Sequence, residues 1–220
     1  MTQSTSIWDS FNHTVLVTWD GTGLPKVLAG AVAESIPSGT LHAITGWNPE
    51  GIDADPKTNA DAHRRLVHRL KDEALDWDPV VGASPDGSHH ELGVITGDLS
   101  RTDAAALGAE FDQLAVFELD DEHITVVPCA EGPITTLDRW RPFDELSLTY
   151  DHVSAWRAEH EEITGSTLPR TRCPQCDTPD PQRFLYGMPA RMPPDWMALG
   201  GCVVGPDQTH LRCRACGHSW

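Results

Sequence analysis

The stretch SRTDAAALGAEFDQLAVFELDDEHITVV, residues 100–127, combines the two kinds of element from which the fold is built. Ser100 with Asp103 three residues later is a helix-start pattern, and small and apolar residues follow it at helical spacing. Two apolar, β-branched runs then meet at the polar pair Asp120-Asp121, which is typical of a β-hairpin. The helix is expected to bury Ala104, Leu107 and Phe111, and the hairpin to pair residues 114–119 with residues 123–127.

The same alternation of strands and helices extends upstream of this stretch. Thr58, with Asp61 three residues later, is predicted to start another helix. The expected strands comprise residues 13–19, 41–45, 77–81 and 92–96, and the expected apolar stripe of the helix comprises Ala62, Leu66, Val67, Leu70 and Ala74. The order β-β-α-β-β-α-β-β predicts an α+β fold, a largely antiparallel sheet with two helices.

Length and composition favour one ordinary domain followed by a small module. The chain has 220 residues, of which 39% are hydrophobic. We expect an acidic α+β domain over residues 1–130, a partly helical connector over 131–169 and a zinc ribbon over 170–220. Residues 165–169 are expected to be a flexible hinge, because glycine, serine and proline concentrate there.

Two cysteine pairs of the form Cys-x-x-Cys carry the strongest chemical signal. Cys173 and Cys176 precede Cys213 and Cys216 by 36 intervening residues. A two-residue spacing lets one tight turn direct both sulfurs at a single ion, so the four thiolates predict a structural Zn²⁺ site with one ion per chain. Gly217 and Asp177, directly after the pairs, suit the left-handed backbone that closes such turns. Iron in a rubredoxin-like site remains the alternative metal.

The other cysteines and the nearby histidines are expected to play no part in the metal cage. Cys129 and Cys202 follow or begin apolar runs, where a single thiol is usually a small buried hydrophobe. His210 and His218 flank the second pair and are expected at the surface or outside the ligand shell. Short strands are predicted at residues 184–186, 202–204 and 209–212. Disulfides are disfavoured because a cytosolic chain keeps its thiols reduced.

Charge and hydropathy restrict the partners. The formal net charge is −17, and residues 1–169 carry 10 Lys and Arg against 29 Asp and Glu. This acidity disfavours nucleic-acid binding by the N-terminal part and leaves only weak scope for it in the arginine-containing ribbon. No apolar run approaches the ~20 residues of a membrane helix, and no secretory signal is recognised, so a cytoplasmic protein without a membrane span is expected.

The region between His42 and Cys129 resembles DUF3293, a bacterial family of unknown function. The residues that carry the resemblance are Ile44-Thr45-Gly46-Trp47-Asn48-Pro49, the helix opening at Asn59, residues 92–107 and residues 113–117. The C-terminal pattern, with residues 185–189, 200–204 and the final Cys-x-x-Cys-Gly-His-x-Trp, is similar to a small bacterial zinc-ribbon tail. Neither resemblance implies a reaction.

The loop after residues 41–45 is the candidate ligand site. Trp47 and Asn48 could hold a planar ring or a short peptide, and Asn59 would add a donor near a helix start, where anions are favoured. The alternative is that Asn48 and Pro49 form only a turn, that Asn59 only starts a helix and that Trp47 belongs to the core. His89, His90 and Glu91 could ligate a metal, but histidines in a polar loop are usually solvated.

The sequence contains no recognisable catalytic motif, and we therefore expect a binding or adaptor protein with a structural zinc ribbon, whose partner is a protein or a small molecule. An enzyme that acts on a small molecule at the Trp47-Asn48-Pro49 loop is the alternative, with His42, Arg64 or Glu91 as the titratable groups nearby. Electron transfer through an iron-loaded ribbon is a third possibility.

Overall fold

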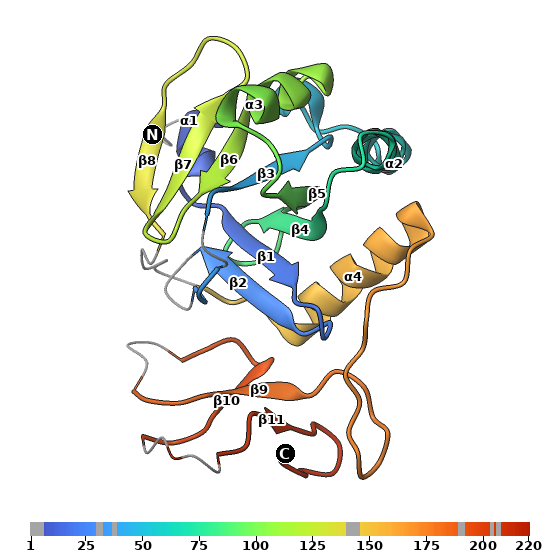
Figure 1. Ribbon diagram of the computed structural model, residues 1–220, viewed down its shortest axis with the longest axis vertical. Coiled ribbons are helices and arrows are strands. Elements are labelled where there is room, and N and C mark those ends of the chain that lie inside the picture. Colours follow the sequence, from blue (N-terminus) through green and yellow to red (C-terminus); the bar gives the residue numbers. More distant parts are fainter. Residues whose placement is uncertain are drawn as a thin grey trace, which may run out of the picture.

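The computed structural model describes residues 7–29, 33–36, 39–139, 146–188, 192–202, 205 and 208–220. A curled, eight-stranded sheet with the spatial order β2-β1-β4-β5-β3-β6-β7-β8 dominates it (Figure 1). Every neighbouring pair is antiparallel, as predicted. The strands are β1 (Val15–Trp19), β2 (Pro25–Ala29), β3 (Leu41–Thr45), β4 (Asp78–Ala83), β5 (His90–Thr96), β6 (Ala115–Leu119), β7 (His123–Pro128) and β8 (Thr135–Asp138).

Both faces of the central strands are buried. Successive side chains along these strands are apolar, instead of alternating between apolar and polar. Along β1, Val15 and Val17 belong to one core cluster, whereas Leu16 between them belongs to another. Successive residues of a strand point to opposite faces, so the sheet separates an outer core from an inner one. The inner cluster also contains Ala43 and Val80, from strands at some distance in the sequence.

Helices cover the outer face, and the prediction of only two helices is wrong. The described residues contain α1 (Ile7–Phe11), the 3-10 turn η1 (Pro49–Gly51), α2 (Pro56–Asp72), α3 (Arg101–Glu110) and α4 (Tyr150–Thr164). α2 and α3 pack on one part of the outer face through Leu66, Leu70 and Leu107. α4 covers another part through Trp156. Within the predicted connector 131–169, the structure therefore places an edge strand, β8, and a covering helix, α4.

The helix starts show how local chemistry fixes the boundaries. Ser100 is the N-cap of α3, as predicted, and accepts a hydrogen bond from the Asp103 amide at 3.2 Å. The prediction of Thr58 as N-cap of α2 is wrong. Asp55 takes that place and accepts from the amides of Lys57 and Thr58, while Pro56 occupies the first turn, where its missing N–H costs nothing.

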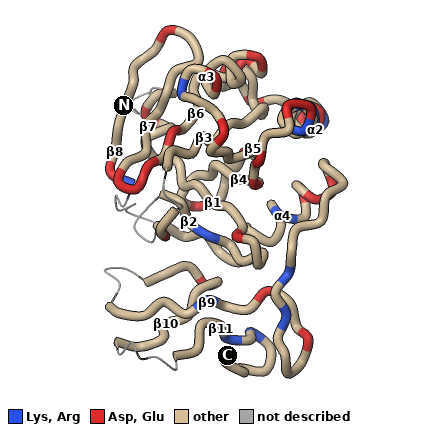
Figure 2. The backbone as a smooth tube through the Cα atoms, viewed as in Figure 1, with Lys and Arg blue, Asp and Glu red and all other residues tan. Residues whose placement is uncertain are grey.

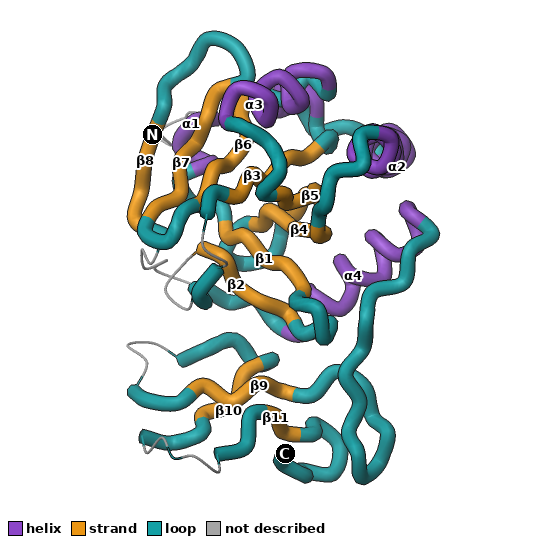
Figure 3. The backbone as a smooth tube through the Cα atoms, in the orientation of Figure 1, coloured by secondary structure: helices purple, strands orange, loops and turns teal. Residues whose placement is uncertain are grey.

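Residues 170–220, called here the C-terminal module, form a small three-stranded sheet in the order β10-β9-β11. Figure 3 shows short strands set among long loops. The strands are β9 (Gln182–Leu185), β10 (Met197–Leu199) and β11 (Leu211–Arg212). The strands predicted at 184–186 and 209–212 overlap β9 and β11. The one predicted at 202–204 is not formed at Cys202, and its other two residues lie outside the described part of the chain.

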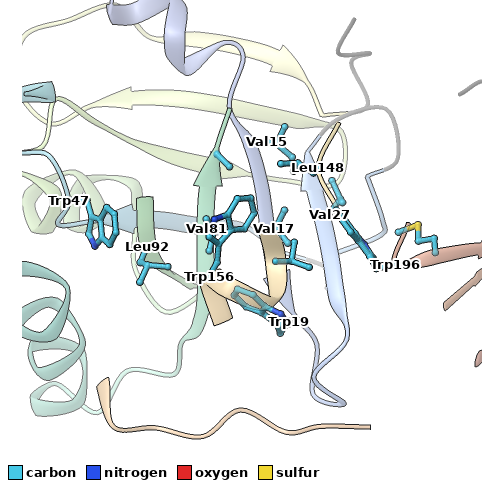
Figure 4. Close-up of a cluster of buried hydrophobic side chains, with 13 residues drawn as sticks. Val15, Val17, Trp19, Val27, Trp47, Val81, Leu92, Leu148, Trp156 and Trp196 are labelled. Atoms are coloured by element: carbon cyan, nitrogen blue, oxygen red, sulfur yellow. The ribbon is translucent and has the colours of Figure 1, made fainter. Parts of the chain in front are cut away.

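The module packs against the rest of the chain, residues 7–169, which we call the body. Trp196 is 1% exposed and belongs to the same cluster as Val17, Val27 and Trp156, between the module and the sheet (Figure 4). Arg183 on β9 forms ion pairs with two carboxylates of the body, Asp20 and Glu34. The Arg214 guanidinium lies 4.1 Å from the ring centroid of Tyr150, at the start of α4.

The segment expected to be a flexible hinge is fixed by hydrogen bonds. Arg157 of α4 is 2% exposed and donates to the carbonyls of Gly23, Leu168 and Pro169. Gly23 has φ +79°, and a Cβ there would lie 1.7 Å from the Pro169 carbonyl oxygen. The β1–β2 turn therefore needs glycine at this close approach, and Arg157 links residues 168 and 169 to both the turn and α4.

Candidate metal centre and ligand cavity

The two cysteine pairs meet in space, as the spacing predicts. The four Sγ atoms of Cys173, Cys176, Cys213 and Cys216 all lie within 4.8 Å of one another. The Cys173–Cys216 and Cys176–Cys213 sulfurs are 3.7 and 3.5 Å apart. The edge of a tetrahedron with Zn–S bonds of ~2.3 Å is about 3.8 Å, so the cluster has the size of a four-thiolate cage and exceeds the ~2.05 Å of a disulfide.

The two cysteine turns have the same backbone geometry. Asp177 and Gly217, at equivalent places, have φ values of 58° and 75°. Their amides donate to the carbonyls of Cys173 and Cys213 at 2.9 and 3.1 Å, which closes each turn. The predicted left-handed positions are therefore confirmed, and each turn directs two sulfurs to the common centre.

The thiols differ in burial and in acidity. Cys173 and Cys213 are buried, whereas Cys176 and Cys216 are exposed. Hydrogen bonds with the side chain and the backbone of Thr178 lower the pKa of Cys176 to about 6. For Cys216 the His218 amide lowers the pKa, but local desolvation and hydrogen bonds with the neighbouring thiols outweigh it and raise the pKa to about 12. Thiolates this close need a cation to balance their charge, so the donor set fits a metal such as Zn²⁺ or iron.

The remaining cysteines lie elsewhere. Cys129 is half-buried beside the α3 cluster, as predicted, and burial raises its pKa to about 11. Cys202 is exposed, so its prediction as a buried hydrophobe is wrong. The reason is that the strand expected to bury it is not formed there. His218 stacks on Trp220 with ring centroids 5.7 Å apart.

A cavity of about 590 Å³ lies over the inner face of the sheet. Its apolar floor comes from β1, β3, β4 and β6, and α1 contributes to the wall. The floor and wall include Leu16, Ala43, Val80, Phe117, Ile7 and Phe11. Gly82 on β4 is also part of the floor, and a Cβ built there has only ordinary contacts, the nearest at 3.4 Å. The missing side chain at this position helps to leave the space empty.

A hydrogen-bonded amide pair fixes the loop at one side of the cavity. Asn59 accepts from the Asn48 amide at 2.9 Å and donates to the Asn48 side-chain oxygen at 3.0 Å. Asn48 itself has a left-handed φ of 51°, which asparagine tolerates. Its Nδ2 donates to Oε1 of Glu91 at 2.8 Å. The pair thus orients Glu91, a cavity-lining carboxylate on β5.

His89 completes this polar side. Its Nε2 lies 3.3 Å from the same Oε1 of Glu91, and both residues line the cavity. The hydrogen bond with Glu91 raises the pKa of His89; burial lowers it, and the charges of Glu91 and Asp53 raise it further. The net result is a pKa above the ordinary value for histidine.

The other residues of the predicted site lie apart from this cavity. Trp47 is 7% exposed and belongs to a core cluster, which agrees with the alternative that it is a core residue. Its carbonyl accepts from Gln113 at 2.8 Å. His42 is buried beside Glu118 on the outer face, and Arg64 pairs with Asp61 on α2. Of the titratable candidates, the structure brings Glu91 alone to the cavity, together with Asn48 from the predicted loop.

His90 does not join its neighbours in a metal site. Its ring stacks on Trp156 at 5.4 Å, and its Nε2 lies 2.8 Å from Glu159 of α4, because alternate residues of β5 point to opposite faces. Among the described residues, the four-cysteine cluster is the one group of His, Cys, Asp and Glu arranged to hold a metal.

Sequence reasoning missed a buried histidine pair. His63 of α2 and His160 of α4 are 0% and 1% exposed, and their ring nitrogens lie 3.0 Å apart. Burial lowers the pKa of His63 to about 3 and that of His160 to about 4. The signal for His63 was its place next to Ala62 and Leu66 on the buried side of α2, but its partner is 97 residues away.

The fold and the sites define a curled antiparallel α+β body with a C-terminal four-cysteine module. Residues 44–116 match the model of a family described as protein of unknown function, DUF3293. This segment, from β3 to β6, includes Trp47, Asn48, Asn59 and Glu91 but not the cysteine cluster. No curated protein and no solved structure matches the chain. No described helix has the length and apolar character needed to cross a membrane.

Proposed function

We propose that the protein binds a small, largely apolar molecule in the cavity on the inner face of its sheet. The observation that carries this proposal is the cavity itself, whose apolar floor faces the converging polar groups of Asn48, His89 and Glu91. Its volume of about 590 Å³ falls in the ~300–1,000 Å³ range typical of ligand pockets. The site lies beside the Trp47-Asn48-Pro49 loop, and whether a reaction follows binding depends on the ligand.

The cysteine cluster is proposed to hold one structural Zn²⁺ per chain, in the form of a zinc ribbon. Four protein ligands leave no open position for substrate, which is the pattern of structural rather than catalytic sites. Metal analysis together with a visible spectrum tests the identity of the ion. One colourless zinc ion per chain supports the proposal, whereas one iron ion and a red protein would favour the rubredoxin-like alternative.

A binding or adaptor role towards another protein is the second candidate. Three large apolar side chains of the module, those of Met188, Met192 and Leu199, are 87, 77 and 48% exposed. Exposed methionines suit adaptable protein contacts. The two candidates differ in their prediction for the cavity, because an adaptor that docks through the module has no need of a ligand there.

The test is to fill the cavity from its floor. In Gly82→Leu the new side chain projects between the paired residues Leu16 and Glu91, where the glycine leaves space. Gly21→Leu is the matched control, because Gly21 lies in a turn where an added Cβ would have nothing within 4 Å, and its φ is not positive. Ligand-detected NMR with a fragment mixture measures binding to each variant.

We expect fragments to bind the wild type and Gly21→Leu, and Gly82→Leu to lose at least 90% of the signal. Circular dichroism checks that both variants fold. Fragments that bind Gly82→Leu as well as the wild type would overturn the cavity proposal and favour the adaptor role.

A further inference from the structure

We propose that the ligand of the cavity is an organic cation, an apolar body that carries a protonated amine recognised by Glu91. This inference rests on the proposed function and adds the class of ligand to it. It is carried by the charges of the lining, the free oxygen of Glu91 and the apolar floor.

The ionisable groups of the lining have one dominant sign. Two carboxylates, Asp53 and Glu91, border the cavity together with His13 and His89. Among the described residues that line it there is no lysine or arginine. An anion that entered would lose its hydration near two carboxylates, and His89, the lining imidazole whose pKa is raised, is already engaged by Glu91. Phosphates and carboxylates are therefore disfavoured. Figure 2 shows acidic residues spread over the body, which strengthens the same preference at long range.

Glu91 has one oxygen engaged and one available. Oε1 accepts from Asn48 Nδ2 at 2.8 Å and lies 3.3 Å from His89 Nε2. Within the described part of the chain, Oε2 has no hydrogen-bond partner. The side chain is 25% exposed, so this oxygen is only partly solvated and is held in place by the amide pair behind it. A charge-assisted N⁺–H···O⁻ bond from an ammonium group fits such an acceptor.

The pKa of His89 shows that the electrostatic potential in this part of the cavity favours a positive charge. The hydrogen bond with Glu91 and the charges of Glu91 and Asp53 raise its pKa above the ordinary value, although burial acts against this. The carboxylates that raise this pKa also attract an ammonium group that contacts Oε2 of Glu91, the oxygen that His89 does not use. The apolar floor then decides the rest of the ligand, because Leu16, Val80 and Phe117 offer no polar side-chain partner.

The competing explanations of the acidic lining predict different ligands. A metal ion needs at least three ligating groups within reach, and the described residues provide such a group in the cysteine cluster alone. A purely hydrophobic pocket would show no preference for charge. A cation preference that depends on Glu91 therefore separates this inference from both.

The experiment compares three indoles of similar shape by NMR titration at pH 7: tryptamine as cation, 3-ethylindole as neutral compound and indole-3-acetate as anion. We expect tryptamine to bind the wild type at least tenfold more tightly than indole-3-acetate. Glu91→Gln should weaken tryptamine at least fivefold and leave 3-ethylindole within twofold. The matched control is Glu159→Gln, because Glu159 lies beside His90 on the opposite face of the sheet.

Equal binding of tryptamine and indole-3-acetate, or a cation preference that survives in Glu91→Gln, would overturn the inference. If 3-ethylindole binds and Gly82→Leu blocks it but charge has no effect, the proposed function stands and only the ligand class fails. If none of the three compounds binds, this inference fails, and the proposed function fails with it only when the fragment mixture also shows no binding to the wild type.

Discussion

The body and the C-terminal module are stabilised by different means. The body buries apolar side chains on both faces of its sheet, in three clusters. In the described part of the module, no cluster consists of module residues alone, and its largest buried side chain, Trp196, belongs to a cluster of the body. A chain of about fifty residues rarely folds on a core of this size without a metal or disulfides. The four-cysteine cluster and the contact with the body are therefore the two features that can compensate for the small core of the module.

The first prediction removes the ion and should have the largest effect. Apparent binding free energies of structural zinc are about 10–16 kcal/mol, so a strong chelator or Cys213→Ser should unfold the module. The body should stay folded but melt at lower temperature, because Trp196 and Arg183 leave its surface. Limited proteolysis with metal analysis measures this: cleavage should concentrate in residues 170–220.

Cys202→Ser is the control for that experiment, since Cys202 is exposed and outside the cluster. It should keep its metal and its protease resistance. If the module resists proteolysis without metal, its contact with the body is sufficient to keep it folded. The metal would then not be what stabilises the module.

The second prediction breaks the contact between the regions and keeps the ion. Trp196 is 1% exposed, and deleting a buried aromatic side chain costs about 3–5 kcal/mol. Trp196→Ala should lower the free energy of unfolding by that order in urea titrations, with metal content unchanged. Leu199→Ala, at a residue 48% exposed, should change it by less than about 0.5 kcal/mol. A Trp196→Ala variant as stable as the wild type would show that the module is not anchored there.

The third prediction concerns the body alone, and the expected change in the free energy of unfolding is smaller. The pKa values of His63 and His160 are about 3 and 4, below the ordinary 6.5, because burial disfavours the charged form. As pH falls below about 6.5 the unfolded chain binds protons that the folded chain does not, so stability is lost between pH 6.5 and 4. The slope is at most about 1.4 kcal/mol per pH unit for each histidine.

Urea titrations at pH 7.5, 6 and 5 measure this loss. His63→Gln removes one titrating group and should flatten the dependence, whereas His68→Gln, at an exposed position of the same helix, should follow the wild type. Equal slopes for all three proteins would contradict a neutral buried pair at the α2–α4 contact.

The features that could be predicted from the sequence are those that depend on residues close together in the chain. The metal cluster depends on two tight turns, and the residues that close them, Asp177 and Gly217, could be recognised from the motif alone. The α3 N-cap and the hairpins followed from similar short-range chemistry. β2 was missed because no strand was expected between residues 13–19 and residues 41–45, although residues 20–24 form the turn of a hairpin whose second strand begins at Pro25.

The cavity could not be predicted from the sequence, because it depends on register. Leu16, Gly82 and Glu91 lie side by side across three strands, and a shift of one residue would move each to the other face. The candidate loop was found through Asn48, which lines the cavity, but the hydrogen bonds that Asn48 makes depend on residues far away in the sequence. The amides that were expected to contact a ligand bond to each other, and the group that they orient, Glu91, contacts the cavity.

The outer sheet face that Trp196 and α4 cover has a consequence for synthesis of the chain. Val17, Val81 and Leu92 belong to strands that are complete once residue 96 has been made, but α4 and Trp196 follow later. At ~5–20 residues per second, the 100 residues from 96 to 196 take about 5–20 s. During that interval the apolar face of the nascent sheet is exposed, because Trp196 has not yet been synthesised. Such a surface is one that a chaperone would recognise.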